Sequence, residues 1–223
     1  MLTPERSGGA PPQGYWAART FLTGLGIAVP NGVLVAQRED VARESPLLNY
    51  PVVLKAGWLE HKTELDGVVL GLGSIEQLVG AFDEMHGRLG DGDYVIEEQD
   101  VRPHAVEILV GARRDRDFGP VIVVGAGGRE TELHRDVSIE LAPVDRTTAL
   151  SMIARLQCFA LLQGWLGRPA TDIDALAAIV VSVSEAIAAN DAIADFEINP
   201  IRVAPDGALA VDALVLARAA VSR

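Results

Sequence analysis

The chain has 223 residues, of which 49% are hydrophobic and 5% aromatic, and its formal net charge at pH 7 is −12. This length allows one large domain or two small ones with an aliphatic core, and the negative charge argues against nucleic acid or an anionic membrane as the main partner. The single cysteine, Cys158, excludes an intrachain disulfide and a cysteine-based zinc site, and no apolar run is long enough for a membrane span. We therefore expect a soluble, cytoplasmic protein.

The first half of the chain reads as a flexible arm followed by short mixed elements. Residues 1–14 are rich in Gly, Pro and Ser, a composition typical of segments without a packed core. Hydrophobic spacing then predicts, in chain order, a helix over 15–23, a strand over 32–36, a helix over 37–47, strands over 51–56 and 67–71, a helix over 74–89 and a strand over 94–98.

In the second half, the same patterns predict strands over 106–113 and 121–125, a flexible turn over 125–128, a strand over 138–141, helices over 145–156 and 171–190, a hairpin, and a short helical tail. Strands and helices are mixed without strict βαβ alternation, which favours the α+β class with two sub-domains hinged near residues 97–101. The expected division is an arm over 1–14, an N-terminal lobe over 15–98 and a C-terminal lobe over 99–223.

The hairpin from Phe196 to Asp212 is the most informative stretch. Two short apolar segments flank Ala-Pro-Asp-Gly at 204–207, in which Pro and Gly occupy positions that a type I turn prefers. A loop of two or four residues places Asn199 directly opposite Asp212, whereas a three-residue loop with a bulge would put Asp212 on the other face.

With the even loop, three oxygen-bearing side chains share one face of the hairpin. Glu197 lies two residues before Asn199 and therefore points the same way. Facing residues have Cβ atoms about 4.5–5.5 Å apart, close enough to share one cation. An amide oxygen and two carboxylates suit a hard cation, so the hairpin predicts a Mg²⁺ site formed by Glu197, Asn199 and Asp212.

Eight short motifs along the chain resemble, in their order and spacing, those of ATP-grasp proteins. They are Tyr50–Lys55, His61-Lys62-Thr63, Gly67-Val68, Val106–Gly111, Asp117–Val121, Gly127-Gly128, Asp136-Val137 and Glu197–Pro200. The chain most resembles, over roughly residues 15–214, the β-type ATP-grasp subunit or domain of NDP-forming acyl-CoA synthetases. These proteins are also called ADP-forming acetyl-CoA synthetases and are relatives of succinyl-CoA synthetase β.

The resemblance implies an ATP-grasp fold, in which two α+β lobes hold ATP or ADP with Mg²⁺ in the cleft between them. Lys55 would place its ammonium on the α- or β-phosphate, and Glu107 would reach the ribose or support the phosphates. The hinge that binds adenine would contain Glu97, Glu98, Gln99 and Val101. Asn199 and Asp212 would be the metal ligands, with Glu197 as the neighbouring carboxylate.

The resemblance also implies a phosphoryl relay through His61, in which the catalytic residues would be His61, Lys62 and Glu197. Neutral imidazole is nucleophilic near pH 7, and the ammonium of Lys62 would stabilise the phosphorylated ring. The chain contains no CoA-binding Rossmann unit with its glycine-rich fingerprint, so it would work with a CoA-binding α-type subunit or domain, in a heterotetramer. Nucleic acid and membrane partners are not expected.

Two positions depart from the family pattern. Asp66 stands where a phosphate-adjacent glycine is usual, so its carboxylate would repel nucleotide, and Glu140 stands where an arginine is usual, which inverts the charge near Asp136. Arg129 or Arg135 would compensate for Glu140. The two departures allow an alternative, a non-catalytic ATP-grasp module that regulates a partner protein. A further alternative is another ATP-grasp ligase that activates a carboxylate.

Overall fold

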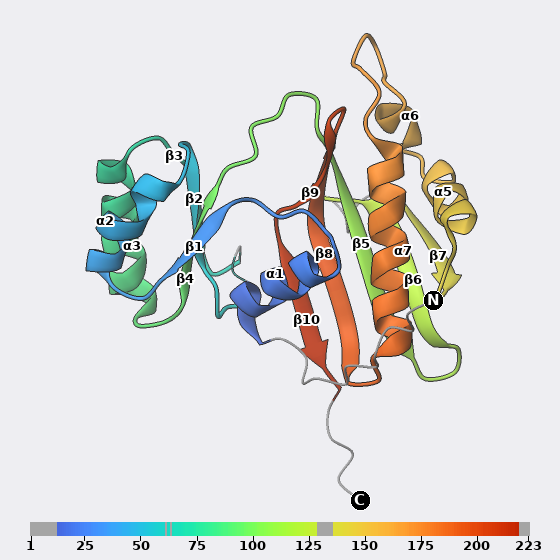
Figure 1. The fold of residues 1–223 in the computed structure, drawn as a ribbon, viewed down its shortest axis with the longest axis horizontal. Coiled ribbons are helices and arrows are strands. Elements are labelled where there is room, and N and C mark those ends of the chain that lie inside the picture. Colours follow the sequence, from blue (N-terminus) through green and yellow to red (C-terminus); the bar gives the residue numbers. More distant parts are fainter. Residues whose placement is uncertain (1–12, 61, 63, 129–135, 219–223) are drawn as a thin grey trace, which may run out of the picture. The chain divides into compact units, whose positions relative to one another are not determined.

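The computed structural model of the chain describes residues 13–60, 62, 64–128 and 136–218 (Figure 1). These residues form two compact units, each with its own hydrophobic core. The small unit contains Gln13–Ala17 and Pro30–Val101, and the large unit contains Ala18–Val29 and the described residues from Arg102 onward. Helix α1 (Gly14–Gly24) is divided between them, because its first residues belong to the small unit.

The small unit is an antiparallel sheet with helices on one face. In the described chain the strand order is β1 (Gly32–Val35), β4 (Tyr94–Glu98), β2 (Val52–Ala56) and β3 (Val68–Leu72). Figure 1 shows α2 (Arg38–Glu44) and α3 (Ile75–Leu89) together on one side of this sheet. Helix α3 begins at Ser74, whose side chain accepts a hydrogen bond from Gln77, and it buries Leu78, Phe82 and Met85 at helical spacing.

The two central strands send alternate residues to opposite faces of this sheet. Leu54 of β2 and Ile96 of β4 pack in the core under the helices. Lys55 lies opposite Val95 in the strand pairing, and Val53 lies opposite Glu97. Because the side-chain period in a strand is two, Lys55 and Glu97 therefore share the face away from α2 and α3.

The large unit is a second antiparallel sheet, packed against helices. The described strands run in the order β10 (Ala213–Ala217), β8 (Ile193–Ala204), β5 (Val106–Asp115), β6 (Gly119–Ala126) and β7 (Val137–Leu141), with β9 (Gly207–Ala210) paired to the end of β8. Helices α5 (Arg146–Ala154), α6 (Phe159–Leu162) and α7 (Ile173–Ala189) follow β7. The side chain of Asp172 caps the N-terminus of α7 by accepting a hydrogen bond from the N–H of Ala175. The apolar face of α7, formed by Leu176, Val180, Val183 and Ile187, is fully buried against the sheet.

The hairpin of β8 and β9 has a two-residue loop, one of the two lengths expected to place Asn199 opposite Asp212. Ala204 pairs with Gly207 and Ile201 with Ala210, so Pro205 and Asp206 form the turn. Strand β10 continues along β8 in the same alignment, with Ala213 opposite Ile198. The predicted helical tail is therefore wrong: these Ala, Leu and Val residues pair with an open strand edge, and tertiary context overrides their helix propensity.

The α+β class and most predicted elements are confirmed, with ends that differ by one to three residues in most cases. The short helix α6 was not predicted, because four residues are too few for a periodic signal. In the described part of the chain, no helix is both long and apolar enough to cross a membrane.

Candidate functional site

The small unit contains a buried ion pair between Lys55 and Glu97. The Lys55 ammonium lies 2.6 Å from Glu97 Oε2, and the two side chains are 7% and 1% exposed. The hydroxyl of Tyr15 donates towards the carboxylate, at 2.8 Å from Oε1 and 3.0 Å from Oε2, and accepts from the Lys55 ammonium at 3.0 Å. Buried charges need partners of this kind, and the three side chains form one hydrogen-bonded cluster.

Lys62 extends this cluster. Its ammonium lies 4.9 Å from the centre of the Tyr15 ring, while the Lys55 ammonium lies 4.3 Å from the same centre. Lys62 is itself buried, at 4% exposure. His61 lies outside the described residues, so its predicted role stays a prediction.

The predicted hinge residues are anchored inside the small unit. The Glu98 carboxylate accepts hydrogen bonds from Asn49 and Asn31. Burial raises the pKa of Glu98, but these hydrogen bonds outweigh it and leave that pKa below its usual value. The backbone N–H groups of Glu98 and Gln99 already donate to the carbonyls of Asn31 and Pro51, so an adenine would have to be bound by other groups of the segment 97–101. Val101 is 63% exposed.

In the large unit, Asn199 and Asp212 are neighbours across the hairpin. The Asn199 N–H donates to the Asp212 carbonyl at 3.1 Å, as the predicted alignment requires. Asn199 Oδ1 accepts from the backbone N–H of Gly128 at 3.1 Å, and Asp212 Oδ1 accepts from the N–H of Ala213 at 2.9 Å. Glu197 is exposed on β8 and pairs with Leu214.

A bulge in β8 sets the face on which these residues lie. Ile198 pairs with Val110 and Ile201 with Ile108, so Asn199 and Pro200 together oppose Leu109. Buried positions change from even to odd numbers at this point, which leaves Glu197 and Arg202 both on the side away from the core.

Arg202, which was not predicted, is the ion-pair partner of the predicted site residue Glu107. Its Nη1 lies 3.0 Å from Glu107 Oε1, and Arg202 and Glu107 are paired residues on β8 and β5. Arg102 lies beside it, with Nη2 bound to the Arg202 carbonyl and Nη1 to Asp206. No local motif marks Arg202, because its partner is brought close only by the pairing of two strands distant in sequence.

Gly127 and Gly128 are required where β6 ends. A Cβ on Gly127 would lie 2.6 Å from the carbonyl carbon of Ile108, and one on Gly128 would lie 2.6 Å from Glu107 Oε2. The backbone of Ile108 cannot swing aside as a side chain can, so this contact fixes Gly127 and holds Gly128 near Asn199.

We expect Gly127→Ala to lower the free energy of unfolding by about 1–3 kcal/mol, because the new methyl group overpacks a backbone contact. The matched control is Gly80→Ala in α3, where a Cβ would meet nothing within 4 Å. A glycine in a helix interior costs roughly 0.5–1 kcal/mol relative to alanine, so this control should raise stability. Urea unfolding of both variants measures the change in the free energy of unfolding, which should be negative for Gly127→Ala and positive for Gly80→Ala. A Gly127→Ala protein as stable as the wild type would contradict the expectation.

The structure explains both departures from the family pattern. Asp66 has a φ of +50°, and its carbonyl accepts a hydrogen bond from Arg88, so glycine and aspartate can serve the same left-handed turn. Glu140 is paired with Arg155, whose Nη2 lies 2.7 Å from its carboxylate. Among the described residues Arg155 thus compensates for Glu140; Arg129 and Arg135, which were predicted for this role, lie outside the described residues.

Asp136 has a structural role beside Cys158. Its carboxylate accepts hydrogen bonds from the backbone N–H groups of Gln157 and Cys158, at 2.7 and 2.8 Å. Burial and the Asp136 carboxylate raise the pKa of the Cys158 thiol to about 12. Cys158 is therefore a protonated, unreactive thiol at neutral pH.

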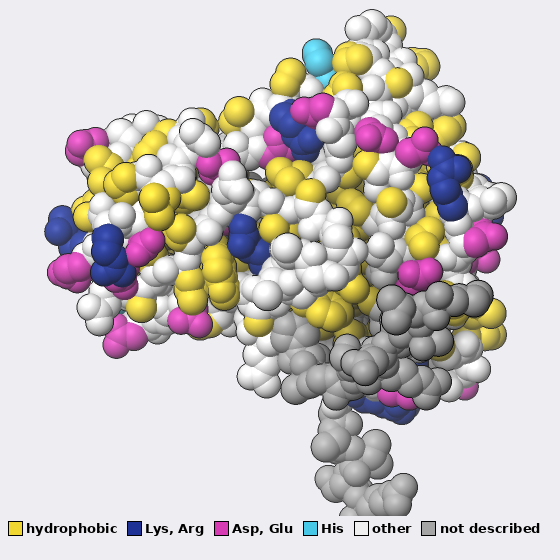
Figure 2. Space-filling model, in the orientation of Figure 1, with side chains coloured by type: hydrophobic (Ala, Val, Ile, Leu, Met, Phe, Trp, Pro, Cys, Tyr) yellow, Lys and Arg dark blue, Asp and Glu magenta, His cyan; other side chains and the backbone are white. Residues whose placement is uncertain are grey.

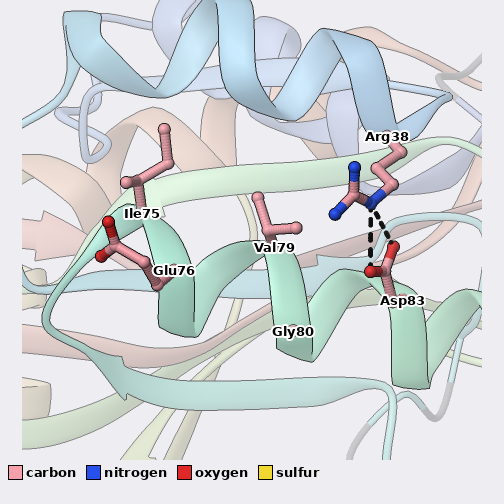
Figure 3. A pocket seen from close by; sticks show the side chains of 6 residues that line it. All are labelled: Arg38, Ile75, Glu76, Val79, Gly80 and Asp83. Atoms are coloured by element: carbon pink, nitrogen blue, oxygen red, sulfur yellow. Dashed lines mark hydrogen bonds and ion pairs between the residues drawn. The ribbon is translucent and has the colours of Figure 1, made fainter.

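A shallow hollow of about 430 Å³ on α2 and α3 lies apart from the predicted site residues (Figure 3). It is crossed by an exposed ion pair in which Arg38 Nε lies 3.0 Å from Asp83 Oδ1. Figure 2 shows acidic and basic side chains mixed over the face drawn, with no broad area of one sign. Neither feature indicates a second ligand site.

Comparison with known proteins agrees with the resemblance read from the sequence. Residues 13–216 match the ATP-grasp domain family. The chain is 32% identical over 206 residues to the beta subunit of acetate–CoA ligase [ADP-forming] I from Pyrococcus furiosus, and the match covers 89% of each chain. It is 32% identical over 210 residues to trans-feruloyl-CoA synthase FCS1 of an unknown prokaryotic organism, but spans only 30% of that longer protein.

A solved structure gives the same result. Dinucleotide-forming acetyl-coenzyme A synthetase 1 of Ca. Korarchaeum cryptofilum, in complex with coenzyme A, Ca-AMPCP and HgCl+, superimposes with a TM-score of 0.85 at 31% identity. The match covers 92% of this chain and 93% of that chain. The predicted ATP-grasp fold and family are thus confirmed. The chain belongs to the ATP-grasp family, in the group that includes the beta subunits of ADP-forming acetate–CoA ligases.

Proposed function

We propose that this chain is the nucleotide-binding part of an ADP-forming acyl-CoA synthetase, and that it transfers a phosphoryl group between a phosphohistidine and ADP. The match to the Pyrococcus furiosus beta subunit over 89% of both chains carries this proposal. In support, a second structure of the Korarchaeum enzyme, with 92% of each chain covered, contains coenzyme A and Mg-AMPPCP and has its phosphohistidine segment pointing towards the nucleotide site.

The residues of the large unit fit a Mg²⁺ ion. Asn199 supplies a hard oxygen donor from β8, and Asp212 supplies another from the short connection between β9 and β10, where the Asn199 N–H donates to its carbonyl. Glu197 is a further carboxylate on the same strand as Asn199. A carbonyl oxygen has two lone pairs, so Asn199 can keep its bond from Gly128 and still bind a cation. Within the described residues no three His, Cys, Asp or Glu side chains converge, which suits an ion that takes one or two carboxylates and completes its shell with phosphate and water.

Bound Mg²⁺ would neutralise charge on the transferring phosphate. The chain's own residues would then bind and orient the nucleotide: Lys55 at a phosphate, Glu107 towards the ribose, and the segment 97–101 at the adenine. The pairing of Glu107 with Arg202 fixes its carboxylate near Gly128, where the glycine turn begins.

His61 would carry the phosphoryl group. In the direction of ATP synthesis, the P–N bond to the imidazole breaks while a terminal oxygen of ADP forms the new P–O bond, and a proton from solvent restores the neutral ring. Lys62, the next residue, would stabilise the phosphorylated form. The phosphoryl group would come from an acyl phosphate made on a CoA-binding α-type subunit or domain, consistent with relatives in which a single chain is about three times as long as the match.

Mg²⁺-dependent thermal stabilisation by ADP tests this function. Binding stabilises the folded state by RT ln(1 + [L]/Kd), about 2.7 kcal/mol at a hundredfold excess over Kd. We expect a rise in Tm with Mg-ADP that Asp212→Ala abolishes. Asp191→Ala, which removes a carboxylate that is 88% exposed on the same unit, should keep the rise. No rise in the wild type would favour the non-catalytic module instead.

A further inference from the structure

The chain uses lysine at two places only. Of its 19 basic residues other than histidine, Lys55 and Lys62 are the lysines and all others are arginines. Lysine is almost never fully buried unless it is paired, yet these two are 6% and 4% exposed. Both ammonium groups lie against one aromatic ring, that of Tyr15. Both lysines of the chain are therefore buried beside the same ring, where the compact charge of an ammonium group differs most from the larger, planar guanidinium of arginine.

Tyr15 is fixed in place from its backbone outward. Its N–H donates to the carbonyl of Gly57, just after β2, at 2.7 Å, and its side chain is buried with a residue exposure of 3%. Gly14 approaches the same carbonyl closely, since a Cβ there would lie 3.3 Å from it. The first turn of α1 is thus attached to the strand that carries Lys55.

The hydroxyl and the ring of Tyr15 make different kinds of interaction. The hydroxyl lies between the Lys55 ammonium and the Glu97 carboxylate, accepting a hydrogen bond from the first and donating one to the second. The ring face attracts cations through its quadrupole, and its centre is 4.3 Å from one ammonium and 4.9 Å from the other. Two like charges held near one ring would repel each other, and the Glu97 carboxylate, ion-paired with Lys55, reduces that repulsion.

We propose that Tyr15 is a positioning residue that gathers Lys55 and Lys62 into one phosphate-binding pair; this rests on the proposed function, in which these lysines serve the nucleotide and the phosphorylated His61. A phosphate bound by Lys55 would compete with the Glu97 carboxylate for the ammonium charge. The Tyr15 hydroxyl keeps donating to Glu97 and so lowers the cost of that competition. The ring meanwhile keeps Lys62 beside Lys55.

Three variants separate these effects. Tyr15→Phe removes the hydroxyl and keeps the ring, whereas Tyr15→Leu removes both. The matched control is Tyr50→Phe, also in the small unit, because the Tyr50 hydroxyl is buried without a hydrogen-bond partner among the described residues. Circular dichroism and Tm show which variants are folded.

The first measurement needs no nucleotide. Protein labelled with ¹³C-lysine gives two lysine side-chain signal sets, assigned with Lys62→Arg. We expect both sets to be shifted upfield by the ring current of Tyr15, unchanged in Tyr50→Phe, largely kept in Tyr15→Phe and lost in Tyr15→Leu. Unshifted lysine signals in the wild type, or shifts that persist in a folded Tyr15→Leu protein, would overturn the arrangement.

The second measurement tests the consequence for function. We expect Tyr15→Leu to weaken Mg-ADP binding by about tenfold, the effect of losing roughly 1.4 kcal/mol of cation–π and hydrogen-bond energy, with Tyr15→Phe in between and Tyr50→Phe equal to wild type. The positioning role would be overturned if the Tyr15→Leu protein loses the upfield shift of its lysine signals and still binds Mg-ADP as tightly as the wild type. If the wild type itself does not bind Mg-ADP, the proposed function fails and the spectra alone decide the role of the ring.

Discussion

Replacement of Lys55 with methionine is expected to lower the free energy of unfolding by about 3–5 kcal/mol, because it removes one partner of a buried ion pair with Glu97. Glu97 is 1% exposed, and the Tyr15 hydroxyl would remain as its donor among the contacts described above. The double variant Lys55→Met/Glu97→Gln removes both charges and should recover most of the loss, since an uncharged pair of similar volume carries little desolvation cost. Urea unfolding, followed by fluorescence and circular dichroism, measures both.

The matched control for this ion pair is Asp83→Asn on the same unit. Arg38 and Asp83 are 3.0 Å apart, like many close ion pairs, but their side chains are 60% and 49% exposed. Solvent screening limits such a pair to about 0–1 kcal/mol, so this variant should be close to wild type. If the Lys55→Met protein is as stable as the Asp83→Asn protein, Lys55 and Glu97 do not form the buried ion pair that the structure shows.

Replacement of His61 with alanine is expected to leave ADP binding nearly intact and to abolish ATP formation from acyl-CoA, ADP and phosphate in the presence of the CoA-binding partner. The imidazole is the nucleophile that carries the phosphoryl group, and alanine offers no substitute for it. The transfer can also be followed in reverse without the partner. The chain alone, incubated with Mg²⁺ and ATP labelled on the γ-phosphate, should acquire an acid-labile label that His61→Ala lacks.

His86→Ala is the control for this experiment. His86 lies in α3, 3.0 Å from the exposed Asp91, and has no place in the proposed relay. It should acquire the label as the wild type does. Label on the His61→Ala protein, or full turnover with the partner, would exclude His61 from the phosphoryl relay and leave the Asn199–Asp212 pair as the site to be explained.

Local sequence was enough for the features that depend on near neighbours. The turn residues Pro205 and Gly207 predicted the turn, and an even loop length was expected to place Asn199 opposite Asp212. The structure has a two-residue loop and this alignment, because register follows from turn geometry in a hairpin. Ser74 and the spacing of Leu78, Phe82 and Met85 predicted α3, since capping and amphipathic periodicity act within a few residues. The order of the motifs indicated the family, and the match over residues 13–216 confirms it.

Tertiary structure alone decided which groups at a distance meet. Strand pairing joins Glu107 to Arg202, 95 residues apart, and the end of α5 brings Arg155 to Glu140. The tail at 213–217 became a strand because β8 offered an edge, against its helix propensity. Tyr15 reaches Lys55 and Glu97 only because the start of α1 is bound to the end of β2. Contacts between residues far apart in sequence depend on how whole sheets and helices pack, which no short window of sequence contains.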